Sequence, residues 1–189
     1  MKFLKRANVS VDRMINIVED LEVISRLETD DNELELENFN IVHIINEVFD
    51  QMELKAGQMK IKLELKNESN SPLVYADKNK IQQVFMNLIS NSIKYGKESG
   101  TTSVRLFDMT DKTLIEVADD GIGIDEDSLN RLFERFYRVD KNRSREIGGT
   151  GLGLAIVKHI IEAHQQTINV RSTVDLGSTF SFILEKGKN

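Results

Sequence analysis

The chain has 189 residues, of which 40% are hydrophobic and 30% charged, and its formal net charge is −6. This length allows one ordinary domain and an additional segment, and the negative charge disfavours a nucleic-acid partner, because phosphate backbones attract basic surfaces. The sequence contains no cysteine, which excludes disulfides and thiolate metal sites.

Hydrophobic residues recur at three- and four-residue steps from about residue 8 to residue 28, which predicts one long N-terminal helix. Its apolar stripe is wider than one packing surface needs, so we expect a partner helix; packing on its own domain is the ordinary alternative. The polar run Thr29-Asp30-Asp31-Asn32 predicts a linker. The chain therefore divides into residues 1–29 and a domain of residues 30–189.

In the second segment, predicted helices and strands alternate. A short strand around residues 34–39 precedes a helix that Asn40 caps, and a second long helix runs from a cap at Asp77 to Tyr95. Further strands are expected at residues 61–65, 73–75, 103–109, 114–119, 167–172 and 179–184, and a third helix at residues 150–164. This layout predicts an α/β (α+β) fold, a two-layer sandwich of a mixed β-sheet and three main helices behind one N-terminal helix.

The helix that ends at Tyr95 carries a polar face. Gln83, Asn87 and Asn91 fall four residues apart, and Lys94 and Tyr95 extend the same face by one turn. Carboxamide oxygens suit a Mg²⁺ ion that already carries phosphate oxygens, and a lysine would neutralise a phosphate. The alternative is a solvated polar face, although asparagine is a poor helix former.

A carboxylate and two glycines end the strand predicted at residues 114–119. Asp119 is in step with Ile115 and Val117, so it should point toward the core, where a carboxylate needs a hydrogen-bond partner. An adenine amino group would provide that partner, and Gly121 and Gly123 would let the backbone approach a flat base. The alternative is an ordinary Asp-Gly turn.

Four glycines in Gly148-Gly149-Thr150-Gly151-Leu152-Gly153-Leu154 lead into the third predicted helix. Backbone N–H groups and the helix N-terminus make a cradle for phosphate. The spacing differs from that of the Walker loop and of the dinucleotide fingerprint.

Aromatic and basic residues share the stretch between the two glycine motifs. Phe133, Phe136 and Tyr137 lie beside Arg138, and basic residues continue to Arg145. We expect a lid in which Arg138 or a neighbour contacts phosphate; a solvated basic loop is the alternative.

In their order, Asn87…Asn91, Asp119-x-Gly121-x-Gly123, Phe133…Phe136 and Gly149-Thr150-Gly151-Leu152-Gly153-Leu154 resemble the asparagine, first glycine, phenylalanine and second glycine boxes of sensor histidine kinases. Gly177-Ser178-Thr179-Phe180 resembles the closing glycine box, and the resemblance covers about residues 34–186. It implies the Bergerat ATP-binding fold shared with DNA gyrase and mismatch-repair ATPases, with ATP and Mg²⁺ as cofactors. It also implies Asn91 on Mg²⁺, Asp119 on adenine and the glycine loop on phosphates.

The residues predicted to bind ATP are Asn87, Asn91, Lys94, Tyr95, Asp119, Gly121, Gly123, Ile124, Phe133, Tyr137, Arg138, Gly149, Thr150, Gly151, Leu152, Gly153, Leu154 and Thr179.

The N-terminal helix resembles the second helix of that family's dimerisation hairpin, whose first helix carries the phosphorylated histidine in His-Glu-x-x-Thr-Pro. His43, His159 and His164 do not stand in that context, and for His159 and His164 we expect a packing or surface role. The resemblance thus implies a protein-histidine kinase domain that donates the γ-phosphoryl of ATP to a histidine on a hairpin not present in this chain. From there the phosphoryl passes to an aspartate of a response regulator. We expect no catalytic residue beyond those that orient ATP and no autophosphorylation by this fragment alone.

Three positions separate this chain from related families or from its own. Related ATP hydrolases place a glutamate as general base where Asn87 stands, so this site should orient ATP and not activate water. His164-Gln165-Gln166 stands where the family usually has His-Gly-Gly, which removes the usual glycine cap. Asp120 replaces a common asparagine and adds negative charge near the base.

We expect a cytoplasmic domain without membrane contact, whether or not its parent is anchored in the inner membrane, because no apolar run approaches the ~20 residues of a membrane helix. The parent should be a homodimer. Two other functions compete with phosphoryl donation: a non-catalytic ATP-sensing or pseudokinase module, and a gyrase-type ATP hydrolase clamp.

Overall fold

The computed structural model describes residues 34–69, 72–139 and 150–188, and in the N-terminal segment residues 11, 14, 15, 17, 18, 20–22 and 25. The predicted linker, Gly149 and the basic residues from 141 to 145 lie outside these ranges. None of the helices in the described ranges combines the length and the apolar character that crossing a membrane requires.

Strands and helices follow the predicted order closely. The strands are β1 (Leu36–Asn40), β2 (Lys62–Asn67), β3 (Leu73–Asp77), β4 (Thr101–Asp108), β5 (Lys112–Asp119), β6 (Asn169–Thr173) and β7 (Gly177–Lys186). The helices are α2 (Ile41–Gln58), α3 (Lys78–Tyr95), α4 (Glu126–Leu129) and α6 (Gly153–Ala163). The short helix α4 was not predicted; Asp125 caps it by accepting a hydrogen bond from Ser128 N at 2.9 Å.

The strands form one seven-stranded mixed sheet in the order β1-β3-β7-β5-β4-β2, and β6 also pairs with β7. Only the pairing of β2 with β4 is parallel among the described strands. β7 pairs with β5 along its length, while its other edge pairs first with β6 and then with β3. This register places Asp119 directly opposite Ser178.

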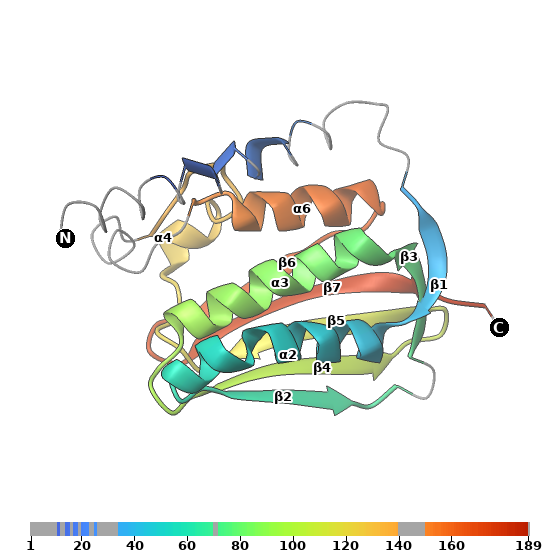
Figure 1. Cartoon of the computed structure of the whole chain (residues 1–189), viewed down its shortest axis with the longest axis horizontal. Helices are drawn as coiled ribbons and strands as arrows, with labels where there is room; N and C mark the ends of the chain where they lie inside the picture. Colours follow the sequence, from blue (N-terminus) through green and yellow to red (C-terminus); the bar gives the residue numbers. More distant parts are fainter. Residues whose placement is uncertain are drawn as a thin grey trace.

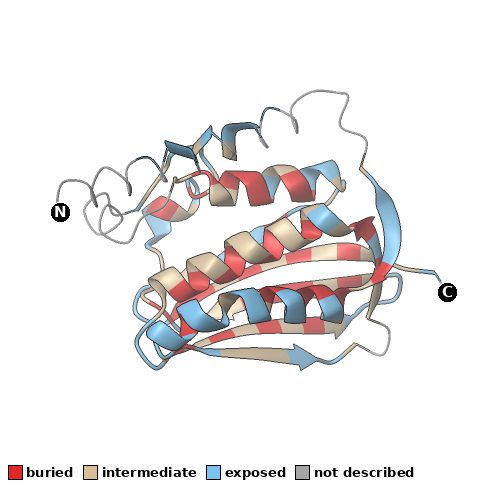
Figure 2. Ribbon diagram, viewed as in Figure 1, coloured by how far each residue is buried: buried red, intermediate tan, exposed pale blue. Residues whose placement is uncertain are grey.

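The three main helices cover one face of the sheet, with α3 between α2 and α6 (Figure 1). Side-chain caps start two of them: Asn40 Oδ1 accepts from Val42 N at 2.9 Å, and Asp77 Oδ1 from Lys80 N at 3.0 Å. Buried residues occur on all three helices and on the strands beneath them (red in Figure 2) and form one hydrophobic cluster, which confirms the two-layer sandwich. The rings of Phe85 and Phe182 bridge the layers, with centroids 6.1 Å apart.

His164 joins the end of α6 to the start of α3. Its Nδ1 lies 2.7 Å from Ile160 O, and its Nε2 accepts a hydrogen bond from Asp77 N at 3.0 Å. The predicted packing role of His164 is therefore confirmed. Gln165 takes the left-handed conformation, with φ +58°, at the turn where the family usually has glycine. A non-glycine residue in this conformation costs about 1–2 kcal/mol.

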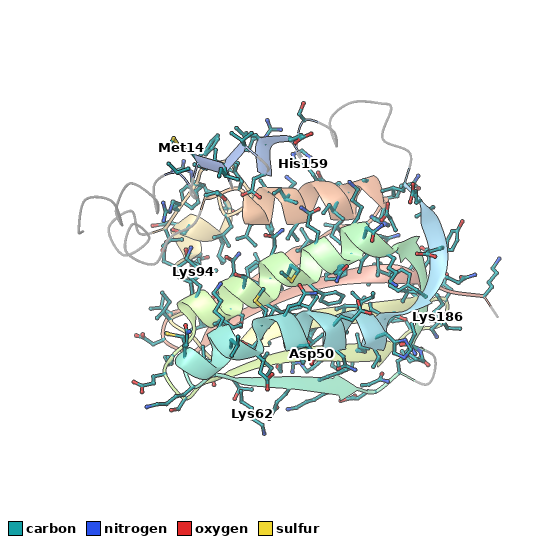
Figure 3. The ribbon with its side chains drawn as sticks, viewed as in Figure 1. Met14, Asp50, Lys62, Lys94, His159 and Lys186 are labelled. Atoms are coloured by element: carbon teal, nitrogen blue, oxygen red, sulfur yellow. The ribbon has the colours of Figure 1, made fainter. Side chains whose placement is uncertain are left out.

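Every described position between residues 11 and 25 is helical, and this segment runs along the outer side of α6 (Figure 1). Ile17 packs against the core, whereas Met14 and Val18 are 58% and 63% exposed. Met14 lies on the side away from α6 (Figure 3). The segment therefore leaves most of its described apolar side chains in solvent, and the predicted partner helix remains an expectation.

Candidate functional site

A cavity of about 850 Å³ opens between the helical layer and one end of the sheet. Its size is that of a site for a small molecule or cofactor. The predicted residues that line it are Asn87, Asn91, Lys94, Tyr95, Asp119, Gly123, Ile124, Tyr137, Arg138, Thr150, Gly151, Gly153 and Leu154. Motifs that are widely separated in the sequence therefore converge on one space.

We call the side formed by Asp119, Gly123, Ile124 and Ser178 the sheet wall. Asp119 ends β5 on the same face as Val117, as predicted, and its Oδ1 accepts a hydrogen bond from Gly121 N at 2.9 Å. Burial raises the pKa of the Asp119 carboxyl, and hydrogen bonds from the backbone of Gly121 and Ser178 oppose that rise. A buried acceptor at a cavity wall is suited to a ligand that brings an N–H donor.

Glycines allow close backbone approach around the sheet wall. A Cβ on Gly123, where φ is +68°, would lie 2.0 Å from Thr173 O. At Gly177, where φ is +114°, it would lie 2.0 Å from Asp119 O, and at Gly121 it would lie 2.6 Å from Asp119 Oδ1. Larger residues at these positions would displace the backbone that fixes Asp119.

The opposite side, which we call the helical wall, consists of Asn87, Asn91 and Lys94 of α3, Lys55 of α2, and Thr150, Gly151, Gly153 and Leu154 of the glycine loop and α6. These three α3 residues and Tyr95, the fourth predicted on this helix, all line the cavity, and Figure 3 shows Lys94 at the end of α3 nearest α4. Gln83, one turn earlier, is not among the lining residues.

Within the described ranges there is no cluster of three or more His, Cys, Asp or Glu residues suited to a metal ion. The helical wall offers neutral carboxamide oxygens instead. Such a donor set suits Mg²⁺ only when the ligand supplies further oxygens, as a polyphosphate does.

Hydrogen bonds to Leu152, Asp20 and Phe136 hold the glycine loop before α6 in place. Thr150 Oγ1 accepts from Leu152 N at 3.2 Å and donates to Asp20 Oδ2 at 2.7 Å. Gly151 has φ +78°, and its carbonyl accepts from Phe136 N at 2.9 Å, so the phenylalanine and second glycine motifs touch. The loop ends at Gly153, where α6 begins, and the amides of a helix N-terminus favour an anion there.

The predicted lid region contacts the cavity through Arg138, which lines it. Tyr137 is held in place because its hydroxyl donates to Ser128 Oγ at 3.0 Å and the Arg131 guanidinium lies 4.4 Å from its ring centroid. Phe136 is 54% exposed and has φ +61°.

Several predicted residues do not line the cavity. Gly121, Phe133 and Leu152 are not among the lining residues, and Leu152 is fully buried. Thr179 pairs with Ala118 and thus faces the other side of the sheet. Ser178 lines the cavity in its place, because side chains alternate along a strand.

Lys55 and Asp20 line the cavity, although the sequence did not predict them as site residues. Burial raises the pKa of the Asp20 carboxyl, and its hydrogen bond with Thr150 opposes that rise. No sequence signal pointed to Asp20, because its contact joins positions 130 residues apart. Lys55 lay on a predicted helix, but nothing in the helix pattern distinguished it from a surface lysine.

Asp120 does not line the cavity. Both oxygens of its carboxylate lie within hydrogen-bond distance of Thr101 N, at 2.9 and 3.0 Å. The carboxylate therefore accepts a backbone hydrogen bond at the start of β4. His159 lies on α6 with its Nε2 3.4 Å from Arg135 Nη2, and burial together with the charge of Arg135 lowers its pKa. These contacts support the packing or surface role predicted for His159.

Residues 76–188 match the family described as histidine kinase-, DNA gyrase B-, and HSP90-like ATPases. The chain is 36% identical to the sensor histidine kinase WalK of Bacillus subtilis over 185 residues, which is 97% of this chain and 30% of WalK. It is similar to the crystal structure of full-length ShkA in complex with AMPPNP, with a TM-score of 0.85 and 25% identity over 100% of this chain and 39% of ShkA.

A third similarity is to the histidine kinase ThkA in a crystal structure with the response regulator TrrA. The TM-score is 0.79 and the identity 26%, over 99% of this chain and 51% of ThkA. The chain spans between 24% and 30% of the length of the curated relatives it matches.

Proposed function

Because the chain belongs to the family of histidine kinase-, DNA gyrase B-, and HSP90-like ATPases, we propose that residues 30–189 are the ATP-binding catalytic domain of a two-component sensor histidine kinase. One observation carries this proposal: residues of the asparagine motif and of both glycine motifs, which occupy separate elements, line one cavity of about 850 Å³ together with Tyr137 and Arg138. The similarity to sensor kinases over 97% of the chain supports the same assignment.

The two walls suggest how ATP is held. Asp119 would accept a hydrogen bond from the adenine amino group, while Gly121 and Gly123 let the backbone approach the base. This choice favours adenine over guanine, which presents a carbonyl at that edge. Ile124 adds an apolar surface at the same end of the cavity.

On the helical wall, the amides of residues 150–154 and the start of α6 would bind phosphate, and Lys94 would neutralise it. Arg138 reaches the same cavity from the lid side. Asn91 would ligate Mg²⁺ through its carboxamide oxygen, and the ion would neutralise phosphate charge during transfer. AMPPNP in the complex of ShkA, to which the chain is similar, supports a nucleotide in this cavity.

The acceptor we propose is a histidine of a dimerisation hairpin outside these 189 residues. Its imidazole nitrogen attacks the γ-phosphorus, the bond to the β–γ bridging oxygen breaks, and ADP leaves. Phosphoryl transfer of this kind depends on positioning and charge neutralisation. Asn87 fits that role, because a carboxamide cannot accept a proton from water as a glutamate does.

A response regulator aspartate would then receive the phosphoryl, as the ThkA–TrrA complex suggests for a related kinase. Residues 1–29 would be the second helix of the hairpin, and the parent a homodimer. The exposed apolar side chains of Met14 and Val18 support a helical partner for this segment.

The test is phosphoryl transfer in trans. The chain is mixed with a separately produced histidine hairpin of a WalK-type kinase and with γ-labelled ATP, and acid-labile, base-stable label on the hairpin is the expected product. A hairpin whose histidine is replaced by glutamine is the matched control. Sustained phosphate release without labelled hairpin would contradict the proposal and favour a hydrolase.

A further inference from the structure

Lys55 enters the cavity from α2, a helix that carries none of the motifs that predicted the site. Its Nζ donates a hydrogen bond to Ser90 Oγ at 2.8 Å, and Ser90 itself lines the cavity. Lys94 lies four residues after Ser90 on α3, one turn along the same face. Two lysines from two helices therefore meet at one side of the helical wall.

The positive charges of Lys55 and Lys94 repel each other. Burial lowers the pKa of Lys55, and the positive charge of Lys94 lowers it further. Across the described ranges, Lys55 makes no ion pair, whereas Lys60 pairs with Glu98 at 2.7 Å and Lys62 with Glu64 at 2.6 Å. Lys55 is an exposed residue whose ammonium group faces that of Lys94, and an anion bound between them would relieve their repulsion.

Among the described residues that line the cavity, neither carboxylate forms an ion pair with Lys55. The two lining carboxylates are hydrogen-bonded elsewhere, Asp119 to Gly121 and Asp20 to Thr150. The lining cations are Lys55, Lys94 and Arg138, in a chain whose net charge is −6. The described lining residues thus carry three cations against the two carboxylates, a small positive excess that favours an anionic ligand.

We propose that Lys55 is a second phosphate-binding lysine. Together with Lys94, it binds the β- and γ-phosphates of ATP from the α2 side of the cavity. The proposal rests on the assignment of this cavity to ATP. The glycine loop at residues 150–154 would contact the polyphosphate from the α6 side. Lys55 would leave Ser90 and bind phosphate when the nucleotide enters, a movement that its flexible side chain permits.

The experiment compares Lys55→Met with the wild-type chain by calorimetry with Mg-ATP, Mg-ADP and AMP. Lys55→Met loses one charged hydrogen bond to phosphate, so its affinity for ATP should fall about tenfold while its affinity for AMP stays unchanged. Lys55→Arg should keep most of the wild-type ATP affinity. Lys62→Met is the matched control, because it removes the same charge from β2 at the sheet edge, away from Lys94 (Figure 3).

A second measurement separates ligand binding from a structural role. The midpoint of thermal unfolding without nucleotide should stay the same or rise in Lys55→Met, because the variant removes repulsion with Lys94. Unchanged ATP affinity, equal loss for AMP and ATP, or a lower midpoint would each overturn the proposal.

These outcomes are distinct from failure of the proposed function. Wild-type chain that binds ATP but labels no hairpin would overturn the kinase assignment, while the Lys55 comparison would still be decided by affinity alone. Wild-type chain that binds no adenine nucleotide would overturn both.

Discussion

The two walls of the cavity are built in opposite ways. The sheet wall is a backbone structure: Asp119 is fixed by strand register, its carboxylate accepts from Gly121 N, and Gly177 packs against its carbonyl. The helical wall is a set of long polar side chains on α2 and α3 and a glycine loop whose contacts reach Phe136 and Asp20. A pre-organised wall suits a flat, invariant base, and an adaptable wall suits a phosphate chain that changes length during the reaction.

If the sheet wall is backbone-built, the largest effect should come from Gly177→Ala. A Cβ there would lie 2.0 Å from Asp119 O on a residue with φ +114°, so the free energy of unfolding should fall by about 2–4 kcal/mol. Urea denaturation measures this change. Gly57→Ala is the control, because no atom lies within 4 Å of its added Cβ and alanine near a helix end should be neutral or stabilising. Equal stability of the two variants would show that the wall tolerates displacement.

Asp119→Asn should weaken ATP binding by about 1.5–3 kcal/mol, because it removes a charged acceptor for the adenine amino group. This energy corresponds to a roughly ten- to hundredfold loss of affinity. Calorimetry with Mg-ATP measures it. Asp120→Asn is the neighbouring control: its carboxylate serves Thr101 N outside the cavity, so affinity should stay constant. An unchanged affinity in Asp119→Asn would refute the adenine assignment.

On the helical wall, Asn91→Ala should act only through the metal. We expect about a tenfold loss of Mg-ATP affinity and little change when EDTA replaces Mg²⁺, because the carboxamide serves the ion and not the base. Binding of fluorescent ATP in both conditions provides the measurement. An equal loss in EDTA would mean that Asn91 contacts the nucleotide directly.

Lowering the pH should weaken ATP binding, because it protonates Asp119 in the sheet wall. The raised pKa of Asp119 means that its carboxylate takes up a proton at a higher pH than an ordinary aspartate. ATP affinity should therefore fall on acidification before carboxylates of ordinary pKa titrate. Because burial disfavours the charged carboxylate, the stability of the fold should rise as Asp119 takes up its proton. Asp119→Asn should flatten this part of the affinity–pH curve, and an unaltered curve would assign the titration to another group.

The smallest effect concerns Asp20, whose carboxylate reaches Thr150 in the helical wall. Its negative charge should repel a polyphosphate, so Asp20→Asn should strengthen ATP by about 0.5 kcal/mol, given screening at a half-buried site. Glu22→Gln, on the same segment outside the cavity lining, is the control. Weaker binding in Asp20→Asn would instead make Asp20 part of the ligand contact.

The sequence by itself determined most of the secondary structure and the motifs that line both walls of the cavity. Asn40 and Asp77 marked the helix starts, alternating residues marked the strands, and Asp119 with its glycines marked the sheet wall, because these signals act within a few residues of the chain. The short helix α4 was not predicted from the sequence, because one helical turn has no periodic pattern of hydrophobic residues.

Only the tertiary structure decided which side chains share the cavity. Whether Ser178 or Thr179 lines the sheet wall depends on strand register, and local motifs do not specify register. Lys55 and Asp20 reach the helical wall because α2 packs beside α3 and the N-terminal segment lies along α6. Contacts between elements distant in sequence follow from packing, and packing leaves no mark in the pattern of either element alone.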